Sequence, residues 1–223
     1  MSESMNVLVF APHRDDEIIG LGGTLIKKKE AGDHITVCVV TAREGEVLPA
    51  CTQRIHDEMK RAFDFVGIDK YIGLPFGANL LETVPRLVFY KAFADVVKEV
   101  RPDEVYLPFW GDMQKDHQMT VEAAMVAMRA KFPYRPKRVY AYETLSETGL
   151  NVPSQDKVFY PTVFEDISDQ LEKKLQAMRF YESQLHPFPD LRSLESIEAL
   201  ARLRGATVNV KAAEAFVLIR EIR

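Results

Sequence analysis

The sequence has few cysteines, no long apolar run and no excess of basic residues. Two of its 223 residues are cysteine, Cys38 and Cys51, which are too few for a disulfide framework. No uncharged apolar run reaches about 18 residues, so we expect no membrane span. The 29 basic and 33 acidic residues give a net charge of −4. Because they form no basic stripe, nucleic acid and anionic membrane surfaces are not expected as partners.

The amino terminus lacks a basic segment followed by an apolar one, so we expect no signal peptide and a cytoplasmic protein. No Gly/Ser-rich linker divides the chain. Hydrophobic residues make up 47% and charged residues 28%, the usual balance of a globular protein. We therefore expect one domain over residues 1–223, with the C-terminal part, about 151–223, packed on the sheet.

Strand-like and helical patterns alternate along the first 142 residues. Apolar runs predict strands at residues 6–11, 35–40, 70–74, 104–107 and 138–142. Apolar residues near helical spacing predict helices at residues 18–31, 51–66, 85–100 and 120–131. This order is typical of βα repeats. It predicts an α/β fold: a Rossmann-like three-layer sandwich with a mostly parallel, doubly wound sheet.

The pattern changes in the C-terminal third. An apolar run predicts a strand at 158–165, and a long helix follows at 167–183, capped by Asp166 or Ser168. A second helix is predicted at 193–204, ended by Gly205. The last predicted strand covers 215–219.

A dense group of charged side chains follows the first predicted strand. His13, Asp15, Asp16 and Glu17 lie where that buried strand ends. Ligand sites of open α/β sheets lie at the carboxyl ends of their strands. His13 and Asp16, three residues apart on a loop, can bind a divalent metal. Asp15 is then free to act on a metal-bound water.

The loop after the strand at 104–107 supplies a third candidate ligand. Catalytic zinc sites usually have three protein ligands and one open position. This loop contains Asp112, Gln114 and Asp116 and ends at His117, which opens the next helix. Because both loops follow strands of one parallel sheet, we expect His13, Asp16 and His117 to face one crevice.

Two other interpretations of the first segment are open. The acids at 15–17 could simply favour a helix N-terminus through the helix dipole. Gly20-x-Gly22-Gly23 could instead bind a phosphate in a nucleotide-binding domain. In such a domain the glycines come first, whereas here the histidine and the acids precede them. Close packing of helix on strand is the simpler role for these glycines.

The segment 11–24, with His13-x-Asp-Asp-Glu followed by Gly-x-Gly-Gly-Thr, resembles the signature of the PIG-L/LmbE-like family of zinc-dependent de-N-acetylases. Asp112-x-x-x-Asp116-His117 resembles that family's later metal-binding segment. Further matching segments extend the resemblance over essentially the whole chain. They lie at 41–46, 54–67, 142–144, 181–184, 204–205 and 214–216.

The resemblance implies that His13, Asp16 and His117 hold Zn²⁺, or another divalent metal such as Fe²⁺. It implies that Asp15 is the general base that takes a proton from metal-bound water. The implied reaction removes the acetyl group from an N-acetylglucosamine-like amino sugar or glycoside. The resemblance also implies a homo-oligomer, although the sequence itself shows no interface patch.

Two residues depart from the family pattern. Arg14 replaces the usual proline, and it either contacts an anionic substrate group or points to solvent. Gln114 replaces a histidine thought to stabilise the oxyanion. A glutamine can donate a hydrogen bond but carries no charge and cannot shuttle a proton. This substitution leaves open a catalytically weak member that binds a metal and a sugar.

Further candidate substrate contacts are expected at the same edge of the sheet. Arg43 and Glu44 follow the second predicted strand, and their side chains suit sugar hydroxyl groups. Trp110 lies in the loop before His117 and could form an apolar wall for a sugar face.

Overall fold

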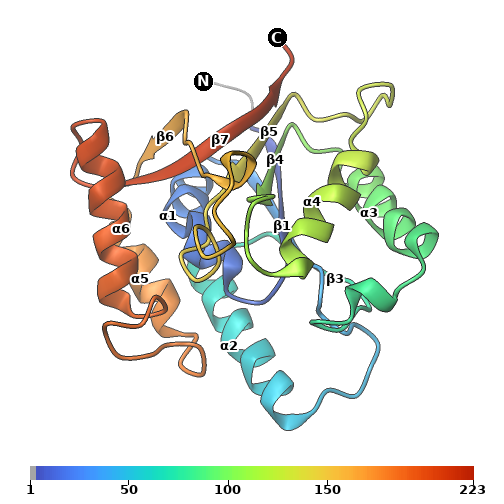
Figure 1. Ribbon diagram of the computed structural model, residues 1–223, viewed down its shortest axis with the longest axis horizontal. Coiled ribbons are helices and arrows are strands. Elements are labelled where there is room, and N and C mark those ends of the chain that lie inside the picture. Colours follow the sequence, from blue (N-terminus) through green and yellow to red (C-terminus); the bar gives the residue numbers. More distant parts are fainter. Residues whose placement is uncertain (1–3) are drawn as a thin grey trace.

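The computed structural model describes residues 4–223, which form one seven-stranded sheet with helices on both faces (Figure 1). The strands are β1 (Asn6–Ala11), β2 (His34–Val39), β3 (Lys70–Gly73), β4 (Glu104–Pro108), β5 (Arg138–Tyr142), β6 (Val163–Asp166) and β7 (Ala213–Glu221). The helices are α1 (Asp16–Glu30), α2 (Ala50–Val66), α3 (Arg86–Val100), α4 (Lys115–Ala127), α5 (Leu171–Arg179) and α6 (Leu194–Thr207), with short 3₁₀ turns η1 (Leu81–Thr83) and η2 (Gln155–Lys157).

The sheet is mostly parallel, which confirms the predicted α/β class. Its strand order is β3-β2-β1-β4-β5-β7-β6. The first five strands run parallel, and β7 runs antiparallel to both of its neighbours. From β1 the chain winds outward to β2 and β3, and it then returns to β4 on the other side. The carboxyl ends of β1 and β4 therefore meet at the topological switch point, where α/β sheets bind their ligands.

Alternate residues of each central strand enter two separate hydrophobic cores. In β1, Val7 and Val9 belong to the core under α1, α2, α5 and α6. Leu8 and Phe10 belong to the core under α3 and α4. Figure 1 shows these two helix groups on opposite sides of the sheet. Burial on both faces explains why the inner strands are uninterrupted apolar runs.

The C-terminal segment adds β7 and β6 to the same sheet and packs α5 against α1. Within residues 4–223, no helix combines the length and apolar character that spanning a membrane requires.

Several predicted boundaries were wrong. Helix α4 begins at Lys115 and not at residue 120, so Asp116 and His117 lie in its first turn. Helix α5 covers only Leu171–Arg179, because Oδ1 of Asp166 accepts the backbone N–H and hydroxyl of Ser168 in a local turn that precedes the helix. The preceding strand is correspondingly short and starts at Val163.

Gly205 does not end α6, which continues to Thr207. A Cβ at residue 205 would lie 2.7 Å from the backbone of Ala212. The glycine therefore allows the chain leading into β7 to pass close to the helix, which explains its presence inside a helix.

Candidate metal centre

The loop after β1 turns sharply into α1 at Asp15. This residue has a φ of 114°, a positive backbone angle that is uncommon for residues other than glycine. Its carbonyl oxygen accepts the N–H groups of Ile18 and Ile19, which starts the helix. The backbone N–H of His13 donates to Oδ2 of Asp16 at 2.8 Å. The turn thus holds the metal-binding candidates and Asp15 at the carboxyl end of β1.

The three predicted ligands lie together. One potential ligand atom from each of His13, Asp16 and His117 is within 4.8 Å of the others. Oδ2 of Asp16 lies 3.3 Å from Nδ1 of His13 and 3.3 Å from Nε2 of His117. Asp16 and His117 are fully buried. Residues from two distant parts of the sequence thus form one compact group of nitrogen and oxygen donors.

Unpaired polar atoms in this group fit a bound cation. Nδ1 of His117 pairs with Oδ2 of Asp112 at 2.8 Å, and the hydroxyl of Thr148 donates to Oδ1 of Asp112 at 2.6 Å. Nε2 of His117 and Oδ1 of Asp16 are buried and have no hydrogen-bond partner. A carboxylate on one ring nitrogen, with the other nitrogen free, is the usual environment of a metal-ligating histidine. The donor set suits a divalent ion such as zinc.

The pKa shifts of the three candidate ligands also favour cation binding. Burial lowers the pKa of His13 and His117, but the neighbouring carboxylates outweigh it. Asp116 and Asp16 raise the pKa of His13 to about 9, and Asp16 and Asp112 raise that of His117 to about 10. Burial raises the pKa of Asp16, yet the two imidazoles hold it well below its usual range. The cluster therefore favours positive charge between its carboxylates.

Asp15 is buried beside the three candidate ligands. Burial raises its pKa to about 7, and the guanidinium of Arg192 opposes this shift. Nη1 of Arg192 lies 3.1 Å from Oδ2 of Asp15 and donates to Oε1 of Gln184 at 2.9 Å. A carboxyl group with a pKa near neutrality can both accept and release a proton. Arg192 was not among the predicted site residues, because nothing near it in the sequence points to Asp15.

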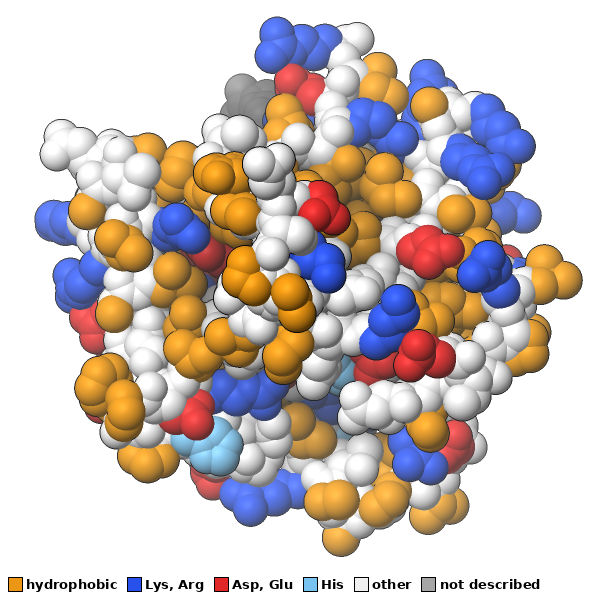
Figure 2. All heavy atoms as spheres, in the orientation of Figure 1, with side chains coloured by type: hydrophobic (Ala, Val, Ile, Leu, Met, Phe, Trp, Pro, Cys, Tyr) orange, Lys and Arg blue, Asp and Glu red, His pale blue; other side chains and the backbone are white. Residues whose placement is uncertain are grey.

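A cavity of about 340 Å³ opens next to the group of candidate ligands. Figure 2 shows a recess below the centre of this face, with histidine and basic side chains at its bottom. Arg192 and Gln184 line the cavity from the C-terminal segment. The sequence-predicted residues that line it are His13, Arg14, Asp15, Arg43 and Gln114.

The two departures from the family pattern both face this cavity. Arg14 is only 6% exposed, so the solvent-facing alternative was wrong. Its Nη2 donates to the carbonyl oxygen of Ala42 at 2.6 Å. Oε1 of Gln114 is buried and has no hydrogen-bond partner among the described residues.

Two predicted substrate contacts lie elsewhere. The carboxylate of Glu44 lies 3.5 Å from the hydroxyl of Tyr71, and the indole N–H of Trp110 donates to the carbonyl oxygen of Asp156 at 2.9 Å. Neither Glu44 nor Trp110 is among the residues that line the cavity. Their proximity in sequence to cavity residues does not bring their side chains into it.

A buried ion pair supports the helix that carries Asp16. Helix α1 is broken at Leu21, whose φ of −148° is outside the helical range. The carboxylate of Glu214 accepts the N–H of Gly23 at 2.9 Å, beyond the break. The ammonium of Lys174 donates to Glu214 at 2.6 Å and to the carbonyl oxygen of Ile19 at 2.8 Å, before the break. The pair thus satisfies backbone groups that the break leaves free.

The glycines of α1 serve close packing. A Cβ at Gly20 would lie 2.4 Å from the ring of Tyr142, and one at Gly23 would lie 2.8 Å from Ile167. Both glycines are buried. The side chains of Tyr142 and Ile167 occupy the space next to these glycines that a phosphate would need. This packing argues against the nucleotide-binding alternative.

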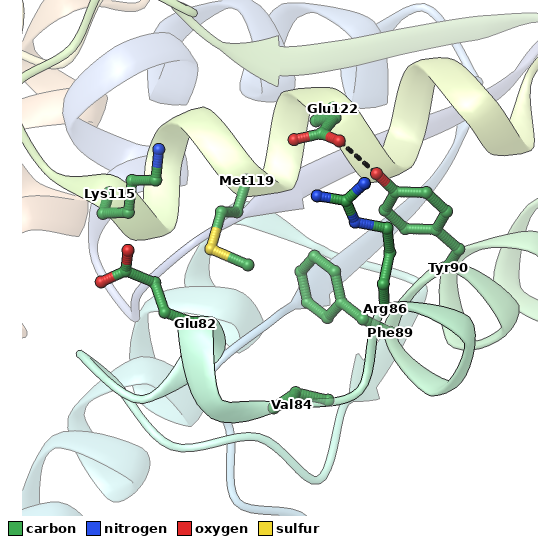
Figure 3. A pocket seen from close by; sticks show the side chains of 8 residues that line it. All are labelled: Glu82, Val84, Arg86, Phe89, Tyr90, Lys115, Met119 and Glu122. Carbon is green, nitrogen blue, oxygen red and sulfur yellow. Dashed lines mark hydrogen bonds between the residues drawn. The ribbon is translucent and has the colours of Figure 1, made fainter.

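A second cavity, of about 400 Å³, lies beside η1, α3 and the start of α4 (Figure 3). The hydroxyl of Tyr90 donates to the carboxylate of Glu122, and both residues line this cavity. None of the predicted site residues lines this cavity, so the cavity at the group of candidate ligands is the candidate site. The lining residues of the second cavity are Glu82, Val84, Arg86, Phe89, Tyr90, Lys115, Met119 and Glu122.

The fold and the site define a Rossmann-like protein with a candidate metal centre at the switch point of its sheet. A family model described as PIG-L, GlcNAc-PI de-N-acetylase, matches residues 8–128, which contain His13, Asp16 and His117. The chain is also 30% identical over 198 residues to diacetylchitobiose deacetylase from Thermococcus kodakarensis, a match that covers 82% of this chain and 70% of that protein. The chain belongs to the PIG-L family.

Solved structures share the whole architecture. The conserved protein TT1542 from Thermus thermophilus has a TM-score of 0.76 and 25% identity, covering 98% of this chain and 96% of that one. The N,N'-diacetylchitobiose deacetylase from Pyrococcus horikoshii has a TM-score of 0.77 and 22% identity, covering 97% of this chain and 84% of that one. At 22% identity, the similarity to the Pyrococcus horikoshii structure is evidence of a shared fold alone.

Proposed function

We propose that the chain is a metal-dependent N-deacetylase that removes the acetyl group from an N-acetylglucosamine-like amino sugar or its conjugate. The observation that carries this proposal is the group of His13, Asp16 and His117 next to a cavity that Asp15 also lines. Family membership and the similarity to a diacetylchitobiose deacetylase support the reaction and the substrate class.

His13, Asp16 and His117 are the residues that would hold the cation, Zn²⁺ or another divalent ion such as Fe²⁺. When bound, the cation would polarise the acetamide carbonyl and make a water molecule more acidic. Oδ2 of Asp112 pairs with Nδ1 of His117 and so keeps the imidazole ring in a fixed orientation.

In this proposal, Asp15 transfers a proton from the attacking water to the leaving nitrogen. It accepts a proton from the attacking water as the water oxygen bonds to the carbonyl carbon. It returns that proton to the nitrogen as the C–N bond breaks, so the products are acetate and a free amine. A pKa raised to about 7 by burial suits both transfers near neutral pH.

In this proposal Gln114 donates a side-chain N–H to the carbonyl oxygen as negative charge develops there. It lines the cavity next to the candidate metal ligands. Because an uncharged amide stabilises an oxyanion less than an imidazolium does, Gln114 also favours a second candidate function. In that candidate, the protein binds a metal and an amino sugar but turns it over slowly.

Acetate release distinguishes the two functions. The zinc-loaded protein is incubated with N-acetylglucosamine, its glycosides, its 1- and 6-phosphates, N-acetylmuramic acid and diacetylchitobiose, and acetate is measured. We expect release by the wild type and a loss of roughly 10²–10⁴-fold in Asp15→Asn with the bound metal retained. Asp95→Asn, an exposed control on α3, keeps full activity. If the wild type binds one metal and releases no acetate from any of these compounds, the deacetylase proposal fails and the binding function is favoured.

A further inference from the structure

Arg14 is a buried cation whose hydrogen-bonding capacity is largely unused. Its side chain lines the cavity and is almost fully buried. Within residues 4–223, its one hydrogen bond joins Nη2 to the carbonyl oxygen of Ala42, and its buried Nε has no partner. A guanidinium in such a position is costly unless an anion pairs with it.

The other two arginines of the cavity already have acidic partners. Nη2 of Arg43 lies 2.6 Å from the carboxylate of Glu46, and Nη1 of Arg192 lies 3.1 Å from that of Asp15. Asp15 is the one acidic residue among those that line the cavity. The lining therefore has a surplus of positive charge, and Arg14 is its source.

We propose that the substrate carries an anionic group, a carboxylate or a phosphate, and that Arg14 binds this group inside the cavity. The proposal rests on the deacetylase function and narrows its substrate class. Arg14 lies between His13 and Asp15 in the chain, and all three line one cavity of about 340 Å³. A sugar-sized ligand that fills this volume contacts Arg14 as well as Asp15.

The chemistry of arginine supports an anion over a neutral hydroxyl. A guanidinium presents a planar fork of N–H donors that matches the two oxygens of a carboxylate or a phosphate. No residue of the described chain accepts a hydrogen bond from Nη1 of Arg14, so this nitrogen is free to donate to an anion in the cavity. A neutral N-acetylglucosamine would leave the charge uncompensated.

The first test measures anion binding without any turnover. The melting temperature of the metal-free protein is followed with inorganic phosphate or sodium formate, against sodium chloride at matched ionic strength. We expect phosphate, formate or both to raise the melting temperature of the wild type and of Arg61→Gln, an exposed control on α2. Arg14→Gln loses this rise, and Arg14→Lys keeps part of it. Equal responses of the wild type and Arg14→Gln would overturn the proposal.

The second test identifies the source of the anion with the zinc-loaded protein. Glucosamine, glucosamine 1-phosphate, glucosamine 6-phosphate and muramic acid are titrated calorimetrically, since none has an acetyl group to lose. We expect at least one anionic sugar to bind roughly tenfold to 100-fold more tightly than glucosamine, and Arg14→Gln to remove that preference. Tighter binding of the sugar phosphates would identify the anionic group of the substrate as a phosphate, and tighter binding of muramic acid would identify it as a carboxylate.

The two proposals fail separately. No preference for any anionic sugar in the wild type would overturn the anion site, whatever the acetate assay gives. An anion preference without acetate release from any acetylated sugar would overturn the deacetylase function alone. A circular dichroism spectrum of Arg14→Gln that matches the wild type excludes misfolding as the cause of its loss.

Discussion

Nη1 of Arg192 lies 3.1 Å from Oδ2 of Asp15, so the C-terminal segment contacts the candidate base in the loop after β1. The same Nη1 donates to Oε1 of Gln184, which restricts the position of the guanidinium. Its charge opposes the effect of burial, which raises the pKa of Asp15. The C-terminal segment therefore does more than cover the sheet, since it adjusts the acidity of Asp15.

Replacing Arg192 should change the pH dependence of the reaction. In Arg192→Gln, a positive charge that lowers the pKa of Asp15 is lost, so this pKa rises further above its ordinary value. Asp15 is then ionised only at higher pH, and the acidic limb of the kcat/KM profile moves upward, by roughly half to one pH unit. Arg192→Lys should shift the limb less. A limb that stays in place in Arg192→Gln would show that the contact does not act on the base.

Asp112 should matter for metal affinity. Its Oδ2 holds Nδ1 of His117, and Thr148 in turn holds its Oδ1. We expect Asp112→Asn to weaken zinc binding by roughly tenfold to 100-fold, because the ring of His117 loses its orienting carboxylate. The affinity is measured by competition with a chromophoric chelator. Thr148→Val should weaken it less, and equal affinities in Asp112→Asn and the wild type would contradict this role.

The pair of Lys174 and Glu214 should be important for stability. Glu214→Gln leaves the buried ammonium without its counter-charge, so we expect a loss of about 3–5 kcal/mol in the free energy of unfolding, measured in urea. The control Asp95→Asn breaks an exposed ion pair with Lys91, and we expect no measurable change. A loss in Glu214→Gln no larger than in the control would mean that the break in α1 does not depend on this pair.

Gln114→His should raise the rate of acetate release or leave it unchanged. An imidazole can carry a charge next to a developing oxyanion, whereas the amide of glutamine cannot. The comparison is made at saturating zinc, as kcat and kcat/KM for one acetylated sugar. A large fall in kcat would assign Gln114 a role of its own that a histidine cannot fill.

Local patterns were sufficient to predict the parallel part of the sheet and the grouping of His13, Asp16 and His117. The predicted strands 6–11 and 138–142 coincide with β1 and β5, since buried parallel strands are continuous apolar runs. His117 was found because the loop after β4 had to meet the loop after β1 at the switch point.

The remaining features depend on contacts between distant residues. Arg192 and Lys174 look like ordinary surface residues in the sequence, because their partners Asp15 and Glu214 lie far away in the chain. Glu44 and Trp110 illustrate the converse. They are neighbours of cavity residues in sequence, yet their side chains contact Tyr71 and the carbonyl oxygen of Asp156.

The central claim is that His13, Asp16 and His117 hold a divalent metal on which deacetylation depends. The most direct measurement strips the protein with a chelator and titrates Zn²⁺ back while acetate release is followed. We predict that activity is absent without metal, rises to a break at about one metal per chain, and shows no such break in His117→Ala. Acetate release that persists in the stripped protein, or a break that survives in His117→Ala, would contradict the account.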